Sequence, residues 1–354
     1  MRNSNQSKGA GSLTPTGSDQ LHASRVAVGL IGPGIVLLIA ERPDLIIFAV
    51  FGSFIGMYGR TEPHHLRVIH QVQAGTVLLV GVGTGVLLSS IHAAPWVLVT
   101  VEAVFAWAGS LLTDRLNVRP RGPFYGIFAV GAIATIPARQ AAPWVALSIY
   151  AVTALFCITI SSVGALLSSS DQSAIARPLA EANRSQLPDS GIHAARYALA
   201  ITLAGSGGLA LGVDHANWAM AAAAVPLAAE NARSAGALSF PGVMQRGTQR
   251  LIGTLAGLVI SAILLLPQFS TTVLAIAAIA LLFPTELYMA RHYALAVGFF
   301  TPLIILVTEL SNPAGAVTFL GDRAIDNVIG VSAGIAVSLA MPGRRPKWRR
   351  RSAA

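Results

Sequence analysis

Residues 143–168 read PWVALSIYAVTALFCITISSVGALLS, a stretch that holds no charged side chain. About 20 consecutive apolar residues are enough to cross the hydrocarbon core of a bilayer as an α-helix. Comparable runs recur along the whole chain of 354 residues. The chain is therefore predicted to be an all-α polytopic membrane protein. An outer-membrane barrel is excluded, because its strands would show short alternations of apolar and polar residues.

The composition excludes a soluble protein. Hydrophobic residues make up 54% of the chain and charged residues 11%, and the mean hydropathy is +0.64. An average soluble domain carries about 25% charged residues. The single cysteine, Cys157, lies in an apolar run and excludes an internal disulfide or a cysteine-based metal cage.

Apolar segments bounded by charge, proline or polar clusters predict about 12 transmembrane helices at about 20 residues each. The segments 26–40, 45–59 and 216–230 are short for a full crossing, so half-helices or tilted ends are expected there. The complete set of segments is 26–40, 45–59, 71–90, 95–113, 122–138, 143–168, 194–212, 216–230, 248–266, 271–289, 293–310 and 323–341.

Positive charge predicts the orientation of the chain. With the N-terminus in the cytoplasm, all but three of the 24 Lys and Arg residues fall on the cytoplasmic side, the exceptions being Arg42, Arg139 and Arg323. Lys and Arg are enriched in cytoplasmic loops, so both termini are predicted to be cytoplasmic in a protein of the inner (plasma) membrane. This bias explains the formal net charge of +9 without a nucleic-acid partner.

Charged and helix-breaking residues concentrate between two apolar blocks of similar length. Each block has an even number of segments and a Gly-Thr pair in its third segment, Gly75–Thr76 and Gly253–Thr254. This predicts two parallel six-helix repeats, related by an axis along the membrane normal, with the functional site between them. The expected parts are a disordered cytoplasmic N-tail (1–24), a first repeat (25–168), a cytoplasmic linker (169–193), a second repeat (194–341) and a basic cytoplasmic C-tail (342–354).

Four elements of the second block resemble one known family in their order and spacing: Arg250-Leu-Ile-Gly-Thr-Leu-Ala-Gly257, Glu286-x-Tyr288, Thr301-Pro302-Leu303 and Arg323-Ala-Ile-Asp326. They resemble the fusaric acid resistance protein family, also called the aromatic acid exporter superfamily, to which the aluminium-activated malate channels are similar. The resemblance covers 196–341 well and 25–168 weakly. It implies six helices per repeat and export of organic anions, commonly aromatic carboxylates. Many members have a large soluble domain between the halves, which is replaced here by a short linker.

The predicted substrate site lies at the inner mouth of the ninth segment. A guanidinium can bind a carboxylate through two hydrogen bonds, and small neighbours let the anion approach. Alternatively, Arg250 is only a positive-inside anchor, and the glycines spaced four apart only let helices pack closely. Arg246, in the loop before the segment, is expected to be dispensable. In the first block Val72 stands at the place of the arginine. The substrate-binding candidates are Arg250, Gly253, Thr254 and Gly257, with Arg67 and His70 at the corresponding place in the first block.

Three further predictions concern polar and aromatic residues within the segments. Glu102 lies too deep to reach water, where comparable charged residues cost about 2.5–3.5 kcal/mol. It is a candidate for proton coupling or gating, or alternatively a neutral, hydrogen-bonded packing residue. Arg323 and Asp326, three apart on one helix, are predicted to form a structural ion pair, with contact to an extracellular anion as the alternative. The outer interfacial belt is predicted to contain Trp96, Trp144 and Trp218.

These features favour an exporter of organic anions, with proton coupling as a hypothesis and no cofactor. The alternatives are a channel-like anion conduit and a non-transporting scaffold. The expected partners are a small organic anion and the lipid bilayer, and a homo-oligomer is a further hypothesis. An enzyme is not expected, because no nucleophile, metal or carboxylate pair gathers at one interface. The motif His64-His65-x-Arg67-x-x-His70 lacks the fixed tetrahedral ligand set of a zinc site. Gly81-Val-Gly-Thr-Gly lacks the lysine and the preceding strand of a phosphate loop.

Overall fold

The computed structural model describes residues 14–60, 62–120, 122–167, 190–212, 216–228, 240–313 and 316–341. These residues form α-helices and two short 3-10 helices, η1 (Pro43–Leu45) and η2 (Phe54–Met57), and no strand. The α-helices are α1 (Gly17–Ile39), α2 (Ile46–Ser53), α3 (His64–Ser90), α4 (Pro95–Leu116), α5 (Phe124–Ala134), α6 (Pro143–Leu167), α8 (Ser190–Ala210), α9 (Ala216–Leu227), α10 (Phe240–Leu265), α11 (Thr271–Met289), α12 (Tyr293–Ser311) and α13 (Ala316–Ala340).

The helices differ in whether they are long enough to cross a bilayer. Within the described residues, 8 helices are long and apolar enough to do so: α1, α3, α4, α6, α10, α11, α12 and α13. The expectation of about 12 transmembrane helices is therefore not confirmed by length and composition. The short segments expected at 45–59 and 216–230 are short apolar helices, and so is Phe124–Ala134, which lies in a segment expected to be full-length.

Several helices begin earlier than their apolar runs, and the difference is largest for α1 and α10. α1 begins at Gly17, so the end of the expected disordered tail 1–24 is helical, while residues 1–13 lie outside the described part. A capping box starts the helix, because the Thr16 and Asp19 side chains each bond the other residue's backbone N–H. Similarly, α10 begins at Phe240 rather than at 248, so Arg246 lies on a helix and not in a loop.

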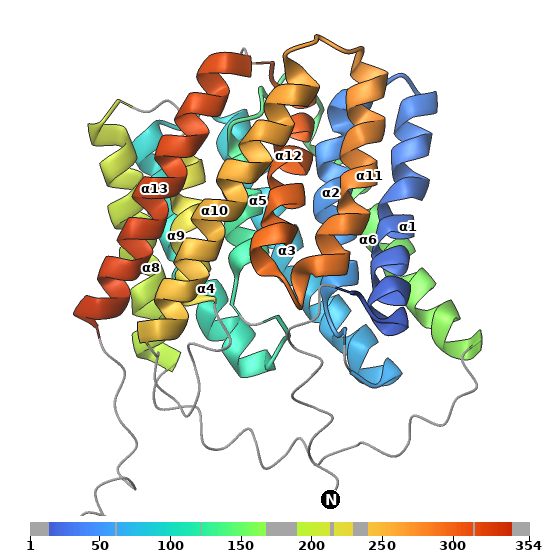
Figure 1. Ribbon diagram of the computed structural model, residues 1–354, viewed down its shortest axis with the longest axis horizontal. Helices are drawn as coiled ribbons and strands as arrows, with labels where there is room; N and C mark the ends of the chain where they lie inside the picture. The colour runs from blue at the N-terminus through green and yellow to red at the C-terminus, as the bar shows by residue number, and fades with distance from the viewer. Residues whose placement is uncertain are drawn as a thin grey trace, which may run out of the picture.

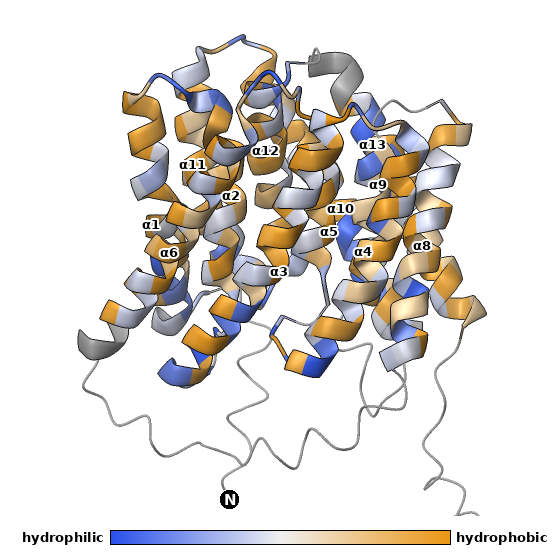
Figure 2. Ribbon diagram, turned by 180° about the vertical axis from the view of Figure 1, so that it is seen from behind, coloured by the Kyte–Doolittle hydropathy of each residue, from blue (hydrophilic) through white to orange (hydrophobic). Residues whose placement is uncertain are grey.

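Four helices form the centre of the bundle (Figure 1). All residues of α2 and α9 are buried, as are most residues of α5 and α12. The surrounding helices expose large apolar side chains, such as Val36, Leu87 and Ile263. Figure 2 shows hydrophobic residues along the outward sides of these helices and hydrophilic residues concentrated toward their ends. A buried centre inside an apolar perimeter is the arrangement expected of a multi-pass membrane protein.

The two halves of the chain contact each other through specific helix pairs. In the first half α3 packs against α5 and α2 against α6, and in the second half α10 packs against α12 and α9 against α13. Between the halves, α1 packs against α11, α4 against α8, and α5 against α9. The central helices α5 and α9 thus meet where the two halves join.

Candidate functional site

A large cavity opens at the end of the bundle where α1 and α10 begin and α11 ends. It has a volume of about 460 Å³ and is called the vestibule here. Its wall contains four arginines, Arg60, Arg119, Arg246 and Arg291, but only two carboxylates. An excess of positive charge in a recess raises the local concentration of anions.

An aromatic chamber of about 100 Å³ adjoins the vestibule. Arg246, Tyr125 and Tyr293 line both cavities. Farther in, the chamber is lined by Phe124, Val297, Phe300 and Arg250. The chamber is therefore a mainly apolar and aromatic space with an arginine at each end.

A third cavity, the deep pocket, follows the chamber and has a volume of about 20 Å³. Arg250 and Phe300 line both of these cavities. The deep pocket adds Thr254, Trp218 and Arg323, among others. Vestibule, chamber and deep pocket thus succeed one another, and an arginine stands at each step: Arg246, Arg250 and Arg323.

The helix repeat places the first two arginines in sequence along this route. Arg246 and Arg250 are four residues apart on α10 and therefore lie on one face, about 6 Å apart along the axis. The Cζ atom of Arg246 lies 3.2 Å from the centroid of the Tyr293 ring. The Cζ atom of Arg323 lies 3.0 Å from the centroid of the Trp218 ring. Stacking on an aromatic face orients a guanidinium while its edge stays available for hydrogen bonds.

Arg250 has unused hydrogen-bonding capacity inside the protein. Its side chain is buried, its Nε has no hydrogen-bond partner, and no carboxylate of the described residues forms an ion pair with it. The neighbouring Thr254 Oγ1 is also buried without a partner. A buried charge without a counter-ion is costly. The Arg250 guanidinium and the Thr254 hydroxyl thus have hydrogen-bond donors that no described residue uses.

Gly253 and Gly257, which the sequence assigns to the same site, face α12 instead. A Cβ at Gly253 would lie 2.7 Å from the Cβ of Val297, and one at Gly257 would lie 2.6 Å from the Cβ of Thr301. The two glycines therefore let the α10 and α12 backbones pack closely. Of the four residues predicted on α10, only Arg250 and Thr254 line a described cavity.

Arg67 and His70 are not near this site. The Arg67 guanidinium donates to the backbone carbonyls of Gly59 and Glu62, each at 3.1 Å, and His70 Nδ1 bonds the Glu62 carboxylate. These bonds fix the turn between η2 and α3. Both residues hold a wall of the vestibule in place, because Gly59 and Glu62 line it, and neither lies beside Arg250. Within the described residues, no group of three His, Cys, Asp or Glu side chains could hold a metal ion.

Arg323 and Asp326, which were predicted to form a structural ion pair, are not joined by a hydrogen bond. Asp326 is fully buried, and neither of its carboxylate oxygens has a hydrogen-bond partner. The Arg323 guanidinium lies on Trp218 instead. Trp218 is 5% exposed, whereas Trp96 and Trp144 are 67% and 71% exposed. The prediction of an interfacial position is therefore wrong for Trp218, because α9 is a central helix.

Glu102 faces the protein interior between α4, α5 and α9. It is fully buried, and neither carboxylate oxygen has a hydrogen-bond partner. Its Oε2 lies 3.1 Å from the point where a Cβ on Gly131 would stand. The hydrogen-bonded packing role, offered as an alternative for Glu102, is therefore not what the structure shows.

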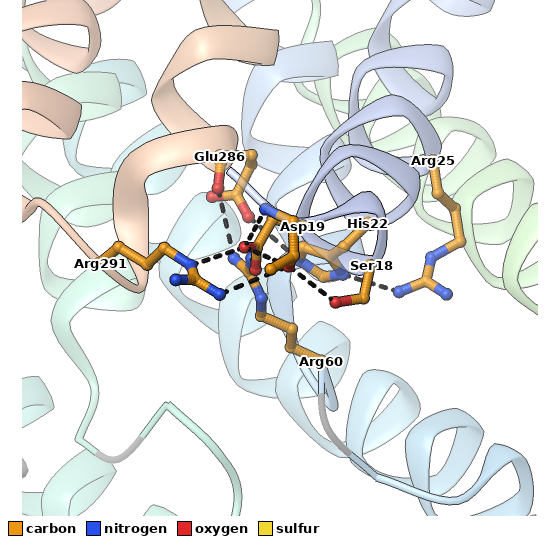
Figure 3. A network of polar contacts seen from close by, with 8 residues as sticks. Ser18, Asp19, His22, Arg25, Arg60, Glu286 and Arg291 are labelled. Atoms are coloured by element: carbon orange, nitrogen blue, oxygen red, sulfur yellow. Dashed lines mark hydrogen bonds and ion pairs between the residues drawn. The ribbon is translucent and has the colours of Figure 1, made fainter. Parts of the chain in front are cut away.

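A polar network joins α1 to α11 beside the vestibule, and the sequence analysis missed it (Figure 3). The Asp19 carboxylate accepts from Arg60 at 2.5 Å and from Arg291 at 2.6 Å. His22 Nδ1 accepts from Arg25 at 2.8 Å, so its Nε2 carries the proton donated to Glu286 at 3.1 Å. The capping-box spacing of Thr16 and Asp19 was the available sequence signal. Asp19 forms ion pairs with both Arg60 and Arg291, so these three groups keep one net positive charge. Arg119 and Arg246 are the vestibule arginines without an ion pair among the described residues.

Residues 199–337, which include α10, α11 and α12 and most of α8 and α13, match the family model described as fusaric acid resistance protein-like. No curated protein and no solved structure matches the chain.

Proposed function

We propose that this chain, whose residues 199–337 belong to the fusaric acid resistance protein-like family, exports organic anions and prefers aromatic carboxylates. The family and the many apolar helices make it a membrane transport or resistance protein. The nature of the substrate and the direction of transport are our proposal. The plasma-membrane location and the cytoplasmic termini are also part of the proposal. The cavities and the distribution of charge support it.

The observation that supports this proposal most strongly is the position of Arg250. It stands between an aromatic chamber and the deep pocket with unused hydrogen-bond donors. A carboxylate can take two parallel hydrogen bonds from a guanidinium. An attached aromatic ring would then pack among Phe124, Tyr125 and Phe300, where stacked and edge-to-face contacts are favourable. A cation would meet like charge at each of the three steps.

The direction of transport follows from the predicted topology. The vestibule lies at the end of the bundle where α1 begins, which the distribution of Lys and Arg predicts to be cytoplasmic. Anions would collect there beside Arg119 and Arg246 and then move inward to Arg250. This sequence of sites supports export rather than uptake.

The helix pairs support the proposal of two parallel six-helix repeats. In these repeats, helices α1 to α6 correspond in order to α8 to α13. The contact between α1 and α11 then corresponds to the contact between α8 and α4, and the contact between α3 and α5 corresponds to that between α10 and α12. Gly81 and Gly85 approach the α5 backbone as Gly253 and Gly257 approach that of α12. In this register, the counterpart of Arg250 is the buried Leu78 and not Val72. The halves would then share a framework, and only the second would supply the central arginine.

Glu102 is the proposed point of proton coupling. An ionisable group buried within a membrane protein is costly and is retained mainly where it has a function. Glu102 has no partner among the described residues that would make it a structural ion. Taking up and releasing a proton there would connect anion export to a pH gradient.

Efflux of benzoate from proteoliposomes tests the function. Arg250→Ala should reduce the rate roughly ten- to hundredfold, because a hydrogen bond to a charged group contributes about 1.5–3 kcal/mol. Arg250→Lys should retain part of the rate, because an ammonium keeps the charge but loses the two-bond geometry. The matched control is Arg115→Ala, which removes an exposed arginine outside the three cavities.

The comparison must be made at equal membrane abundance, because removing an arginine can impair insertion. Normal efflux by Arg250→Ala would contradict a role for this arginine. A preference for aromatic amines over carboxylates would contradict anion export itself. If the wild-type protein moves neither, a non-transporting scaffold becomes the better interpretation, and a flux without saturation would indicate a channel-like conduit.

A further inference from the structure

A second buried polar site lies where α4, α5 and α9 meet, apart from the three cavities. It consists of Glu102 on α4, Asn217 on α9 and the backbone of Gly131 on α5. Glu102 is 0% and Asn217 2% exposed. Both Glu102 oxygens and Asn217 Oδ1 are buried without a hydrogen-bond partner. Three unsatisfied polar atoms in one place are unusual, because buried polar groups are nearly always hydrogen-bonded.

The missing side chain of Gly131 brings the two groups together. A Cβ on Gly131 would lie 3.1 Å from Glu102 Oε2 and 3.1 Å from the Cβ of Asn217. The Asn217 Nδ2 donates to the Gly131 carbonyl at 3.1 Å. The Glu102 carboxyl group and the Asn217 side chain thus both lie against the same glycine.

The hydrogen bonds open to this pair depend on the protonation state of Glu102. A protonated carboxyl group has an O–H that can donate to Asn217 Oδ1, which would satisfy both groups while Nδ2 keeps its bond to Gly131. An ionised carboxylate only accepts, as Asn217 Oδ1 does, so the two oxygens repel and the carboxylate can be satisfied only by the second N–H of the Asn217 amide. Loss of the proton therefore favours a turn of the Asn217 side chain.

Asn217 is adjacent in the chain to Trp218, whose ring supports Arg323. Both residues lie in the first turn of α9, which packs against α5 and α13. A movement of Asn217 therefore occurs directly beside the aromatic face that orients the deep-pocket arginine.

No other titratable group of the described neighbours faces Glu102. The helices packed against α4 are α3, α5, α8 and α9, and α9 carries no titratable side chain. Val99 of α4 meets Gly205 of α8, and Glu102 meets Gly131 of α5, so these helices run antiparallel to α4. The titratable groups of α3, α5 and α8 lie in the first two turns of each helix, at the end of the bundle away from Glu102. They are Tyr125 on α5, His193, Arg196 and Tyr197 on α8, and His64, His65, Arg67 and His70 on α3.

We propose that Asn217 is a positioning residue that senses the proton on Glu102 and adjusts Trp218, and with it Arg323, in the deep pocket. The link to anion movement rests on the proposed function, but the response of Trp218 to the proton does not. Each part can therefore be tested separately.

The first test follows Trp218 in the absence of any substrate. In the full-length protein, the other tryptophans, Trp96, Trp107, Trp144 and Trp348, are replaced by Phe, so that the indole emission reports Trp218 alone. Emission is recorded from about pH 4 to about pH 9, a range that covers the titration of carboxyl groups in proteins. We expect one titration step, which is lost in Glu102→Gln and in Asn217→Leu.

Two further variants keep this test decisive. Asn217→Ser removes the amide with a smaller side chain and should also lose the step, in case Asn217→Leu does not fold. Gly131→Ala places a methyl group between the pair and should shift the step, whereas Gly83→Ala, whose nearest neighbour would be 3.9 Å away, should not. The proposal would be overturned if the titration step persists in the variants that lack the Asn217 amide. It would also be overturned if the parent protein shows no titration step.

The second test measures benzoate efflux with and without a pH gradient. Glu102→Gln and Asn217→Leu should each lose acceleration by the gradient, and the double variant should be no worse than either, because the two residues act as one unit. Gradient-dependent efflux by Asn217→Leu would overturn the coupling role. If the wild-type protein moves no benzoate, the proposed function fails, while the Trp218 titration still decides the role of Asn217.

Discussion

The contact between Arg323 and Trp218 determines how the deep pocket presents its charge. The guanidinium lies against the indole face, so its N–H groups point outward around the ring edge. Phe128 also packs against Trp218, with its ring centroid 5.3 Å from that of Trp218. Arg323 is thereby held by aromatic packing while the Asp326 oxygens remain without hydrogen bonds.

Trp218→Leu should weaken benzoate transport about 2- to 30-fold, because a cation–π contact contributes about 0.5–2 kcal/mol. Trp218→Phe should retain an intermediate rate, since a smaller ring still supports the guanidinium. Trp144→Leu is the control, because Trp144 is exposed at the start of α6. Concentration-dependent efflux measures the effect, and equal losses in the Trp218 and Trp144 variants would contradict a specific role for the stacked pair.

Individual residues were predictable where their local chemistry was decisive. Arg250 and Thr254 stand out as polar residues within an apolar run, and the structure places both in cavities. The role of Trp218 could not be read from the sequence, because the start of a segment does not reveal whether its helix is central or peripheral. The bonds of Arg67 and His70 to Gly59 and Glu62 could not be predicted, because the turn that brings these residues together depends on backbone geometry.

At the scale of elements, the contact between α10 and α12 sets the width of the route. Glycines on α10 bring its backbone against α12, and the same helix then presents Arg250 toward Phe300. Close packing and the proposed anion binding therefore use neighbouring positions on the side of α10 that faces α12. The sequence could not separate them, because glycines and arginine recur at the same spacing of three to four residues.

Gly257→Ala should destabilise the protein without changing its preference among anions. The new methyl group would lie 2.6 Å from the Cβ of Thr301, and overpacking of this kind costs about 1–3 kcal/mol. Thermal unfolding in detergent measures the loss. The matched control is Gly83→Ala, where the nearest atom would be 3.9 Å away. Unchanged stability together with lost anion binding would restore Gly257 to the binding site.

The ends of the elements were less predictable than their centres. Each apolar segment corresponds to one helix, but α1 and α10 continue into polar sequence that an apolar window does not register. In α1 this extension carries Asp19 and His22, and in α10 it carries Arg246. The polar residues of the vestibule were therefore assigned to a tail and a loop, and the prediction that Arg246 is dispensable loses its structural basis.

For the whole molecule, the all-helical, multi-pass class follows from composition alone. The arrangement of four central helices inside a peripheral ring does not follow from composition. The short helices α2 and α5 are more apolar than the helices around them, as is typical of a helix buried on all sides. The central helix α9 gives no such signal, because it is less apolar than the peripheral helices α6 and α11. The membrane orientation remains a prediction from the positive-inside pattern.

Cysteine labelling in a Cys157→Ser background tests this orientation. A cysteine at His92, exposed in the turn after α3, should react with an impermeant thiol reagent added outside the cell. A cysteine at His65, exposed at the start of α3, should react only after the membrane is opened. The opposite pattern would place the vestibule outside and reverse the proposed direction of transport.

The most direct test of the central claim is to locate a bound aromatic carboxylate. Crystals grown with 4-bromobenzoate should show the anomalous signal of bromine within the aromatic chamber, among Phe124, Tyr125 and Phe300, with the carboxylate on Arg250. The signal should disappear in Arg250→Ala at the same ligand concentration. A signal confined to the lipid-facing surface, or one that persists at the same place without the Arg250 guanidinium, would contradict an arginine-guided anion route.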